Sequence, residues 1–133
     1  MELLTNTKSP LVPTISQVPP VPPVTTVSPV TLIPTVSVEI YNYSKTFPKE
    51  ETYSLTDQVR RSSRSVCANL AEAFRKRKYP KHFVSKLSDS EAEAAETQVW
   101  LDFALEFSYI TKQQWEILNN KYENIIGKLV NMS

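Results

Sequence analysis

Residues 47–87 decide the fold of this chain, and they read FPKEETYSLTDQVRRSSRSVCANLAEAFRKRKYPKHFVSKL. Ser54, followed three positions later by Asp57, is typical of a helix start in which each side chain bonds the other residue's backbone. Apolar or small residues then recur at spacings of three and four, which places them on one helical face. These residues are Leu55, Val59, Ser62, Val66, Leu70 and Phe74. We expect this helix to run to about Lys78 and to end before Pro80, because proline lacks the amide hydrogen that a helix interior needs.

Two further amphipathic segments follow. A third helix is expected to begin near Pro80 or Lys81, since proline suits a first helical turn. Its inner stripe comprises Phe83, Leu87, Ala94, Gln98, Leu101 and Leu105. Thr111 with Gln114 predicts the start of a fourth helix by reciprocal capping. The apolar positions of that helix are Trp115, Leu118, Tyr122, Ile125 and Leu129. Because the connections are short, successive helices are expected to be antiparallel neighbours.

The N-terminal quarter has a different composition. Eight of the ten prolines lie between Pro10 and Pro34. We interpret residues 1–34 as an extended or disordered, low-complexity leader. Three interpretations stay open: a passive tail, a proline-rich ligand for a recognition domain, or a segment that is not the natural start of the domain. Val36, Ile40 and Tyr43 stand at helical spacing, which predicts a short first helix over 35–46 and places the domain at 35–133.

These patterns predict an all-α fold, namely an up-and-down antiparallel four-helix bundle with a shortened first helix. A first helix of about eleven residues would reach only about 16 Å, whereas the others would reach roughly 30–40 Å. Part of the bundle groove would then lack its fourth wall, at a cost of about 5–10 kcal/mol. We therefore expect either that the leader lies over this groove or that the subunit depends on assembly.

The composition excludes several classes of protein. Lysine and arginine total 15 against 14 aspartate and glutamate, so the net charge points to no partner. The single cysteine, Cys67, cannot form an intrachain disulfide, which favours a reducing cytoplasm. We expect no signal peptide, because the N-terminus lacks a basic start followed by an unbroken apolar run. We expect no membrane span, because no stretch of about 18 apolar residues occurs. The single glycine, Gly127, excludes a glycine-rich phosphate loop.

Charge is segregated along the chain. Residues 60–86 hold nine basic side chains against one acid, Glu72, whereas residues 89–123 hold eight acids against two lysines. On a helical wheel the arginines of the second helix, together with Lys78, lie opposite its apolar stripe, along about 27 Å. Such a strip can follow a phosphate backbone without reading its sequence. The candidate nucleic-acid-binding residues are Arg60, Arg61, Arg64, Arg75, Lys76, Lys78 and Lys81. The alternatives are a solvated face, arginines paired with acids of the third helix, and a protein partner.

Two other surfaces are candidates for helix or subunit contacts. Small or neutral polar residues beside the core stripe favour close approach of another helix; they are Gln58, Ser62, Ser65, Asn69 and Glu72. An outward apolar patch near the end of the third helix is a candidate oligomer interface, with contact to the first helix as its alternative. This patch comprises Val99, Trp100, Phe103 and Phe107.

Catalytic and metal-binding patterns are missing. Glu91, Glu93 and Glu96 could enter a bundle interior, but the Glu-x-x-His pairs of a di-iron site are absent. His82 lies fifteen residues from Cys67 with no orienting group, so a nucleophile and base pair is not indicated. We expect no metal, no cofactor and no enzymatic activity.

Three segments together resemble a bacterial family, the proteins encoded in intervening sequences of 23S ribosomal RNA genes. They are YNYSKTFPKEETYSL (41–55), QVRRSSRSVCANLAEAFRKR (58–77) and SEAEAAETQVWLDFALEFSYIT (90–111). The resemblance runs from about Val38 to the C-terminus. Upstream the chain departs from the family, because prolines stand where members carry a full first helix.

The resemblance implies a left-handed four-helix bundle, often assembled as a ring-like homopentamer. The family also resembles the accessory protein of diversity-generating retroelements, which has a basic surface. That resemblance implies nucleic acid and a reverse transcriptase as partners. We therefore expect a cytoplasmic homo-oligomer that binds structured RNA or DNA, or a nucleic-acid enzyme such as a reverse transcriptase. The alternative is a protein-interaction scaffold that makes no contact with nucleic acid, and an enzyme comes third.

Overall fold

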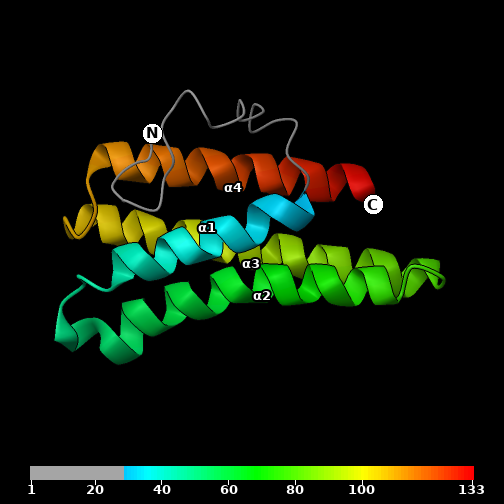
Figure 1. Ribbon diagram of the computed structural model, residues 1–133, viewed down its shortest axis with the longest axis horizontal. Helices are drawn as coiled ribbons and strands as arrows, with labels where there is room; N and C mark the ends of the chain where they lie inside the picture. Colours follow the sequence, from blue (N-terminus) through cyan, green and yellow to red (C-terminus); the bar gives the residue numbers. More distant parts are fainter. Residues whose placement is uncertain (1–28) are drawn as a thin grey trace, which may run out of the picture.

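The described part of the chain, residues 29–133 of a computed structural model, forms four α-helices (Figure 1). They are α1 (Pro29–Ser44), α2 (Asp57–Arg75), α3 (Pro80–Glu106) and α4 (Lys112–Met132). Successive helices run antiparallel, and α1 packs against both α2 and α4, which closes the bundle. The predicted all-α, up-and-down four-helix bundle is therefore confirmed. The prediction of a disordered leader concerns residues 1–28, which lie outside the described residues.

The first helix begins earlier than predicted, at Pro29 instead of Thr35, and Pro34 lies inside it. The apolar pattern continues upstream through Leu32 and Ile33, which are 6% and 0% exposed. Burying such a side chain stabilises the fold by roughly 1.5–3 kcal/mol, which offsets the roughly 3 kcal/mol that an internal proline costs. The predicted short helix was wrong in its start, and residue 34, the predicted domain boundary, falls within α1.

The first helix is held on two sides. Val36 and Ile40 are buried in the core, as their spacing predicts. On the α4 side, the Lys121 ammonium lies 2.9 Å from both carboxylate oxygens of Glu39. With 16 residues α1 is shorter than the 27-residue α3, yet it supplies its own apolar side chains to the groove.

The second helix is entered through a tight segment. A 3₁₀ turn, η3 (Lys49–Glu51), leads into a single π-helical turn, η4 (Thr52–Thr56), and then into α2. The Ser54 hydroxyl donates to the Glu51 carboxylate at 2.7 Å, and that carboxylate accepts from the Leu55 amide at 3.4 Å. The predicted capping box of Ser54 with Asp57 was therefore wrong, because Glu51 caps this turn instead.

The second helix ends at Arg75, before the predicted Lys78. Lys76 leaves the helical region, with φ −100° and ψ 14°. Tyr79 is extended, with φ −118° and ψ 93°, as expected for a residue that precedes a proline. Pro80 then occupies the first turn of α3, as predicted.

Hydroxyl groups join α2 to α3 inside the bundle. The Thr97 hydroxyl donates to the Ser62 hydroxyl at 2.8 Å, and the Ser90 hydroxyl donates to the Val66 carbonyl at 2.7 Å. Nearer solvent, Lys86 pairs with Glu72 at 2.8 Å. The prediction that small polar residues of α2 contact another helix is confirmed at Ser62 and at Glu72.

The core contains most of the predicted apolar positions of α3 and α4. Leu87, Ala94 and Leu101 are buried, but Gln98 is only half-buried and donates to Asn119 and Glu123 of α4. The α4 core positions are buried as predicted except for Trp115, which is partly exposed. The predicted cap at Thr111 is confirmed, since its hydroxyl accepts from the Gln114 amide at 3.1 Å and the Gln114 side chain accepts from the Thr111 amide at 2.9 Å.

The Tyr122 ring fills the centre of the bundle. Its side chain is fully buried, and its hydroxyl has no hydrogen-bond partner within the described residues that meets ordinary geometry. Burial, reinforced by the Glu39 carboxylate, raises the pKa of this phenol far above its usual value. The phenol of Tyr122 is therefore neutral at physiological pH, and Tyr122 acts as a packing residue.

Candidate nucleic-acid interface

Two arginines of α2 lie on one face. Arg64 and Arg75 are separated by eleven residues, so they differ by only about 20° around the helix and by about 16 Å along it. Both side chains are exposed. No carboxylate within residues 32–133 forms an ion pair with either of them.

Arg60 has a structural partner on α1. Its Nε–H donates to the Ser44 hydroxyl at 2.7 Å, and its guanidinium carbon lies 4.6 Å from the centre of the Tyr41 ring. The Ser44 hydroxyl in turn donates to the Tyr41 carbonyl at 2.9 Å. Arg60 is half-buried, so it joins α1 to α2 and does not lie on a freely exposed strip as the helical wheel predicts.

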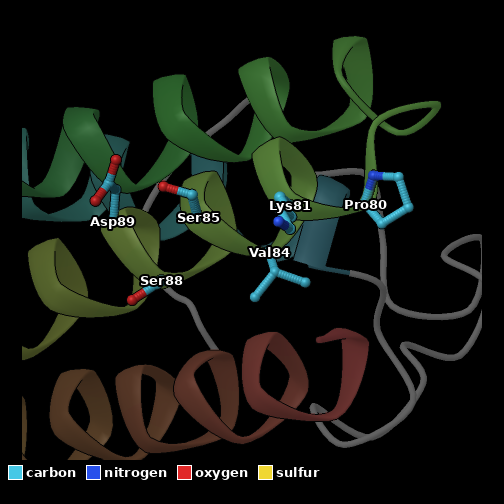
Figure 2. A pocket seen from close by; sticks show the side chains of 6 residues that line it. All are labelled: Pro80, Lys81, Val84, Ser85, Ser88 and Asp89. Atoms are coloured by element: carbon cyan, nitrogen blue, oxygen red, sulfur yellow. The ribbon is translucent and has the colours of Figure 1, made fainter.

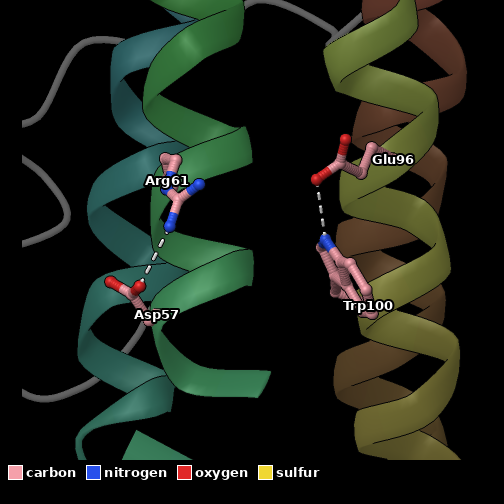
Figure 3. A network of polar contacts seen from close by, with 4 residues as sticks. All are labelled: Asp57, Arg61, Glu96 and Trp100. Carbon is pink, nitrogen blue, oxygen red and sulfur yellow. Dashed lines mark hydrogen bonds and ion pairs between the residues drawn. The ribbon is translucent and has the colours of Figure 1, made fainter. Parts of the chain in front are cut away.

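Arg61 pairs with an acid of its own helix. Its guanidinium lies 3.1 Å from the Asp57 carboxylate one turn earlier, and both side chains are more than half exposed (Figure 3). On α3, Glu96 accepts from the Trp100 indole at 3.1 Å. Arg61 therefore forms its ion pair within α2, while its charge also acts on the Glu93 carboxylate of α3. An exposed pair of this kind is worth only about 0.3–0.5 kcal/mol and exchanges readily.

The other predicted cations lie in the turn between α2 and α3 and in the first turn of α3. Lys76, Lys78 and Lys81 are exposed and have no ion-pair partner among the described side chains. Arg77 lies there as well, and its guanidinium donates to the Phe74 carbonyl at 2.7 Å. Because α2 stops at Arg75, these lysines extend the basic face around the end of the bundle and not along one helix.

A shallow hollow of about 580 Å³ adjoins this turn on α3 (Figure 2). Lys81 lines it together with Asp89, and Val84 points towards α4. An acid therefore shares the hollow with the lysine, so the hollow is not uniformly positive. The basic side chains of the turn, and not this hollow, are the candidate contact for a polyanion.

The outward apolar patch lies at the opposite end of α3. Its ring centres form a series: Trp100 to Phe103 is 6.0 Å, Phe103 to Phe107 is 5.9 Å, and Phe107 to Tyr109 is 5.6 Å. Phe103 and Phe107 are about half exposed. A groove of about 370 Å³ separates these rings from Leu55, Gln58 and their neighbours. The alternative of contact with the first helix is not what the structure shows, because the patch faces η4 and the start of α2.

The Glu51 carboxylate lies at the end of this series of rings, next to Tyr109. Its carboxylate accepts from the Ser54 hydroxyl at 2.7 Å and from the Tyr109 hydroxyl at 2.9 Å. These two hydrogen bonds, in that order, hold the pKa of Glu51 below its usual value. The carboxylate therefore stays charged beside an apolar surface, and it accepts hydrogen bonds from hydroxyl groups of the same chain.

Candidate metal ligands do not converge. Within the described residues, no three histidine, cysteine, aspartate or glutamate side chains are close enough together to hold a metal ion. The His82 ring packs edge-on against Tyr79, at 6.2 Å between centres. Cys67 is half-buried and lines a groove between α1 and α2 that His82 does not line. No helix in the described part of the chain is long and apolar enough to cross a membrane.

The family of the chain follows from comparison with known proteins. The family model described as 23S rRNA-intervening sequence protein matches residues 34–131. The chain belongs to this family. A crystal structure of a protein with unknown function, from the S23 ribosomal protein family of Bacteroides thetaiotaomicron VPI-5482, is similar, with 29% identity and a TM-score of 0.72. The similarity covers 79% of this chain and 97% of that one. The comparison with curated proteins gave no match.

In this member of the 23S rRNA-intervening sequence protein family, two residues near the arginines were missed by sequence reasoning. Tyr41 is partly exposed, and Lys45 lies 5.0 Å from the centre of its ring. The spacing of four between Tyr41 and Lys45 was a signal for contact on one helix. Their approach to Arg60 and Arg64 depends on how α1 packs across α2, and no local sequence pattern specifies this packing.

Proposed function

We propose that this 23S rRNA-intervening sequence protein binds structured RNA through the basic face of α2 and the α2–α3 turn. One observation supports this function above others. Five exposed cations on this face have no carboxylate partner within residues 32–133; they are Arg64, Arg75, Lys76, Lys78 and Lys81. The protein acts in this proposal by binding and not by catalysis, and its single cysteine is compatible with a cytoplasmic location.

The spacing of these cations suits a phosphate backbone. Arg64 and Arg75 span about 16 Å of a rigid helix, while each strand of double-stranded DNA carries a phosphate about every 3.4 Å along its axis, so a nucleic-acid backbone offers several phosphates over this length. Guanidinium groups bind phosphate oxygens in a two-point manner. Such contacts position a protein on nucleic acid but carry no sequence information, so we expect affinity for RNA shape and charge and little sequence preference.

A salt titration tests this function. We expect a fluorescent RNA hairpin to bind the full chain at low salt, with the logarithm of the association constant falling linearly with the logarithm of salt concentration. Five phosphate contacts predict a slope of about −4. Fluorescence anisotropy measures both quantities. Binding that does not depend on salt, or no binding at low salt, would contradict the proposal and favour a protein scaffold.

Self-association is a second candidate function, favoured by the series of exposed rings from Trp100 to Phe107. Contiguous apolar surface of this kind is typical of a protein contact, and a ring with head-to-tail contacts would join this patch to a different one. We expect light scattering to give a mass above that of one chain. Phe103→Ser with Phe107→Ser should reduce the mass to that of a single chain. Val130→Ser, on an equally exposed apolar residue of α4, is the control and should leave the mass unchanged.

A further inference from the structure

We propose that the surface between α1 and α2 holds one unpaired nucleotide, with its base in an apolar groove and its phosphate against three arginines. This inference rests on the proposed RNA binding and specifies its ligand. It predicts that single-stranded segments of an RNA, or its splayed-out nucleotides, contact the protein at Tyr41.

The first part of the subsite is an open groove of about 640 Å³. Its lining is largely apolar and comes from both helices: Pro34, Ser37, Val38 and Tyr41 of α1, and Arg64, Cys67 and Ala68 of α2. Val38 is 59% exposed and Tyr41 is 39% exposed, so apolar and aromatic surface faces solvent here. A flat aromatic group such as a nucleobase, whose ring faces stack on apolar and aromatic side chains, would remove this surface from water.

The second part is a polar hollow of about 370 Å³ directly beside the groove. It is lined by Asp57, Arg60, Arg61, Arg64, Ser65 and Ala68. Arg64 and Ala68 line both hollows, so the apolar site and the arginine site share a border. A nucleotide has a similar division, because a flat aromatic base that stacks through its ring faces is joined through a sugar to a charged phosphate.

The charge balance of the subsite favours an anion. The guanidinium carbons of Arg60 and Arg64 lie 4.6 Å and 5.8 Å from the centre of the Tyr41 ring, and the Lys45 ammonium lies at 5.0 Å. None of these three cations has an ion-pair partner within the described residues. Asp57 is the only acid that lines either hollow, and it is paired with Arg61.

This composition favours an unpaired nucleotide over a duplex. In a duplex the bases are stacked and paired, so a duplex would reach the arginines but would leave the apolar groove unused. Proteins that bind single strands combine cationic tracks with aromatic side chains against which bases pack. The groove, the ring and the arginines supply both elements within two adjoining hollows.

The test compares two probes of equal charge on the full chain. One is a short oligouridylate, and the other is an abasic oligomer with the same number of phosphates. At a fixed salt concentration, we expect the oligouridylate to bind about tenfold more tightly, which is the order of one base–aromatic contact. Tyr41→Ala should bring the ratio of the oligouridylate affinity to the abasic affinity close to one, whereas Tyr41→Phe should leave this ratio near ten.

A second variant tests the contribution of the groove without changing the arginines. Ala68→Leu places a larger side chain on an exposed helical position that borders both hollows. It should also lower the ratio while the arginines and Tyr41 stay in place. Circular dichroism and thermal unfolding establish that each variant is folded.

The outcomes distinguish this inference from the function on which it rests. Equal affinities for the two probes, both dependent on salt, would overturn the nucleotide subsite and leave charge-based RNA binding standing. No binding of either probe or of the hairpin would overturn both proposals. A phosphoserine peptide that competes as well as the oligouridylate, and that depends on Tyr41, would overturn the assignment of the groove to a base.

Discussion

Arg64→Glu combined with Arg75→Glu is expected to weaken RNA binding by about a hundredfold. Non-specific affinities of 10⁻⁴–10⁻⁶ M, shared among five phosphate contacts, correspond to roughly a tenfold factor for each cation. The two arginines lie on one face about 16 Å apart, so one RNA segment can contact both. The slope of the salt dependence should fall by about two, one for each lost contact. Anisotropy with the RNA hairpin measures the affinity and the slope together.

The matched control changes the net charge by the same amount elsewhere. Lys49→Glu with Lys112→Glu alters two exposed lysines, one in η3 and one at the start of α4. We expect this control to lower the affinity only a few-fold, through long-range charge that salt screens. Equal losses in the two double variants would mean that net charge, and not the basic face of α2, governs binding.

Arg60 is left out of this experiment on structural grounds. Its hydrogen bond to Ser44 and its contact with Tyr41 join α1 to α2. Reversing its charge would therefore disturb the docking of the first helix as well as any contact with RNA. A loss of binding in such a variant would not distinguish the two causes.

Ile33→Ala is expected to destabilise the protein by about 2–4 kcal/mol, because it leaves a cavity in a packed core. Ile33 is 0% exposed and precedes Pro34 in α1. For a domain of this size, such a loss corresponds to a fall in Tm of roughly 10–25 °C. Urea unfolding monitored by circular dichroism gives the free energy of unfolding directly.

Val38→Ala is the control for this experiment. Val38 lies in the same helix but is 59% exposed, and exposed substitutions usually change stability by less than about 0.5 kcal/mol. If Ile33→Ala had as small an effect as Val38→Ala, the part of α1 that precedes Pro34 would contribute nothing to the core. A large effect would show that the part of α1 that precedes Pro34 packs into the core in solution.

The fold could largely be predicted because the helices carry their own signals. Thr111 and Gln114 cap α4 as their spacing indicates. The buried positions of this helix follow at intervals of four, three and four, and they are Leu118, Tyr122, Ile125 and Leu129. The start of α1 was missed because tertiary burial of Leu32 and Ile33 outweighs the local effect of Pro34. Local patterns measure propensity, whereas the position of a helix end also depends on what the neighbouring helices bury.

The candidate interface could be predicted only in part. The segregation of charge identified Arg64, Arg75 and the lysines of the turn, and the structure leaves these exposed. A helical wheel treats α2 as an isolated rod, so it placed Arg60 in solvent, although α1 covers that position. The role of Tyr41 depends on an interhelical contact between residues nearly twenty positions apart, and no spacing rule within one helix reaches that far.

The anchoring of Arg60 also affects how an anion would be bound. An arginine side chain that becomes ordered on binding loses rotamer freedom, at about 0.5–1.5 kcal/mol for each such side chain. The Nε–H of Arg60 already bonds Ser44, and its guanidinium rests on Tyr41, so most of that freedom is lost before any ligand arrives. Its remaining N–H groups are thus preorganised, whereas the exposed lysines of the turn must still be immobilised on binding.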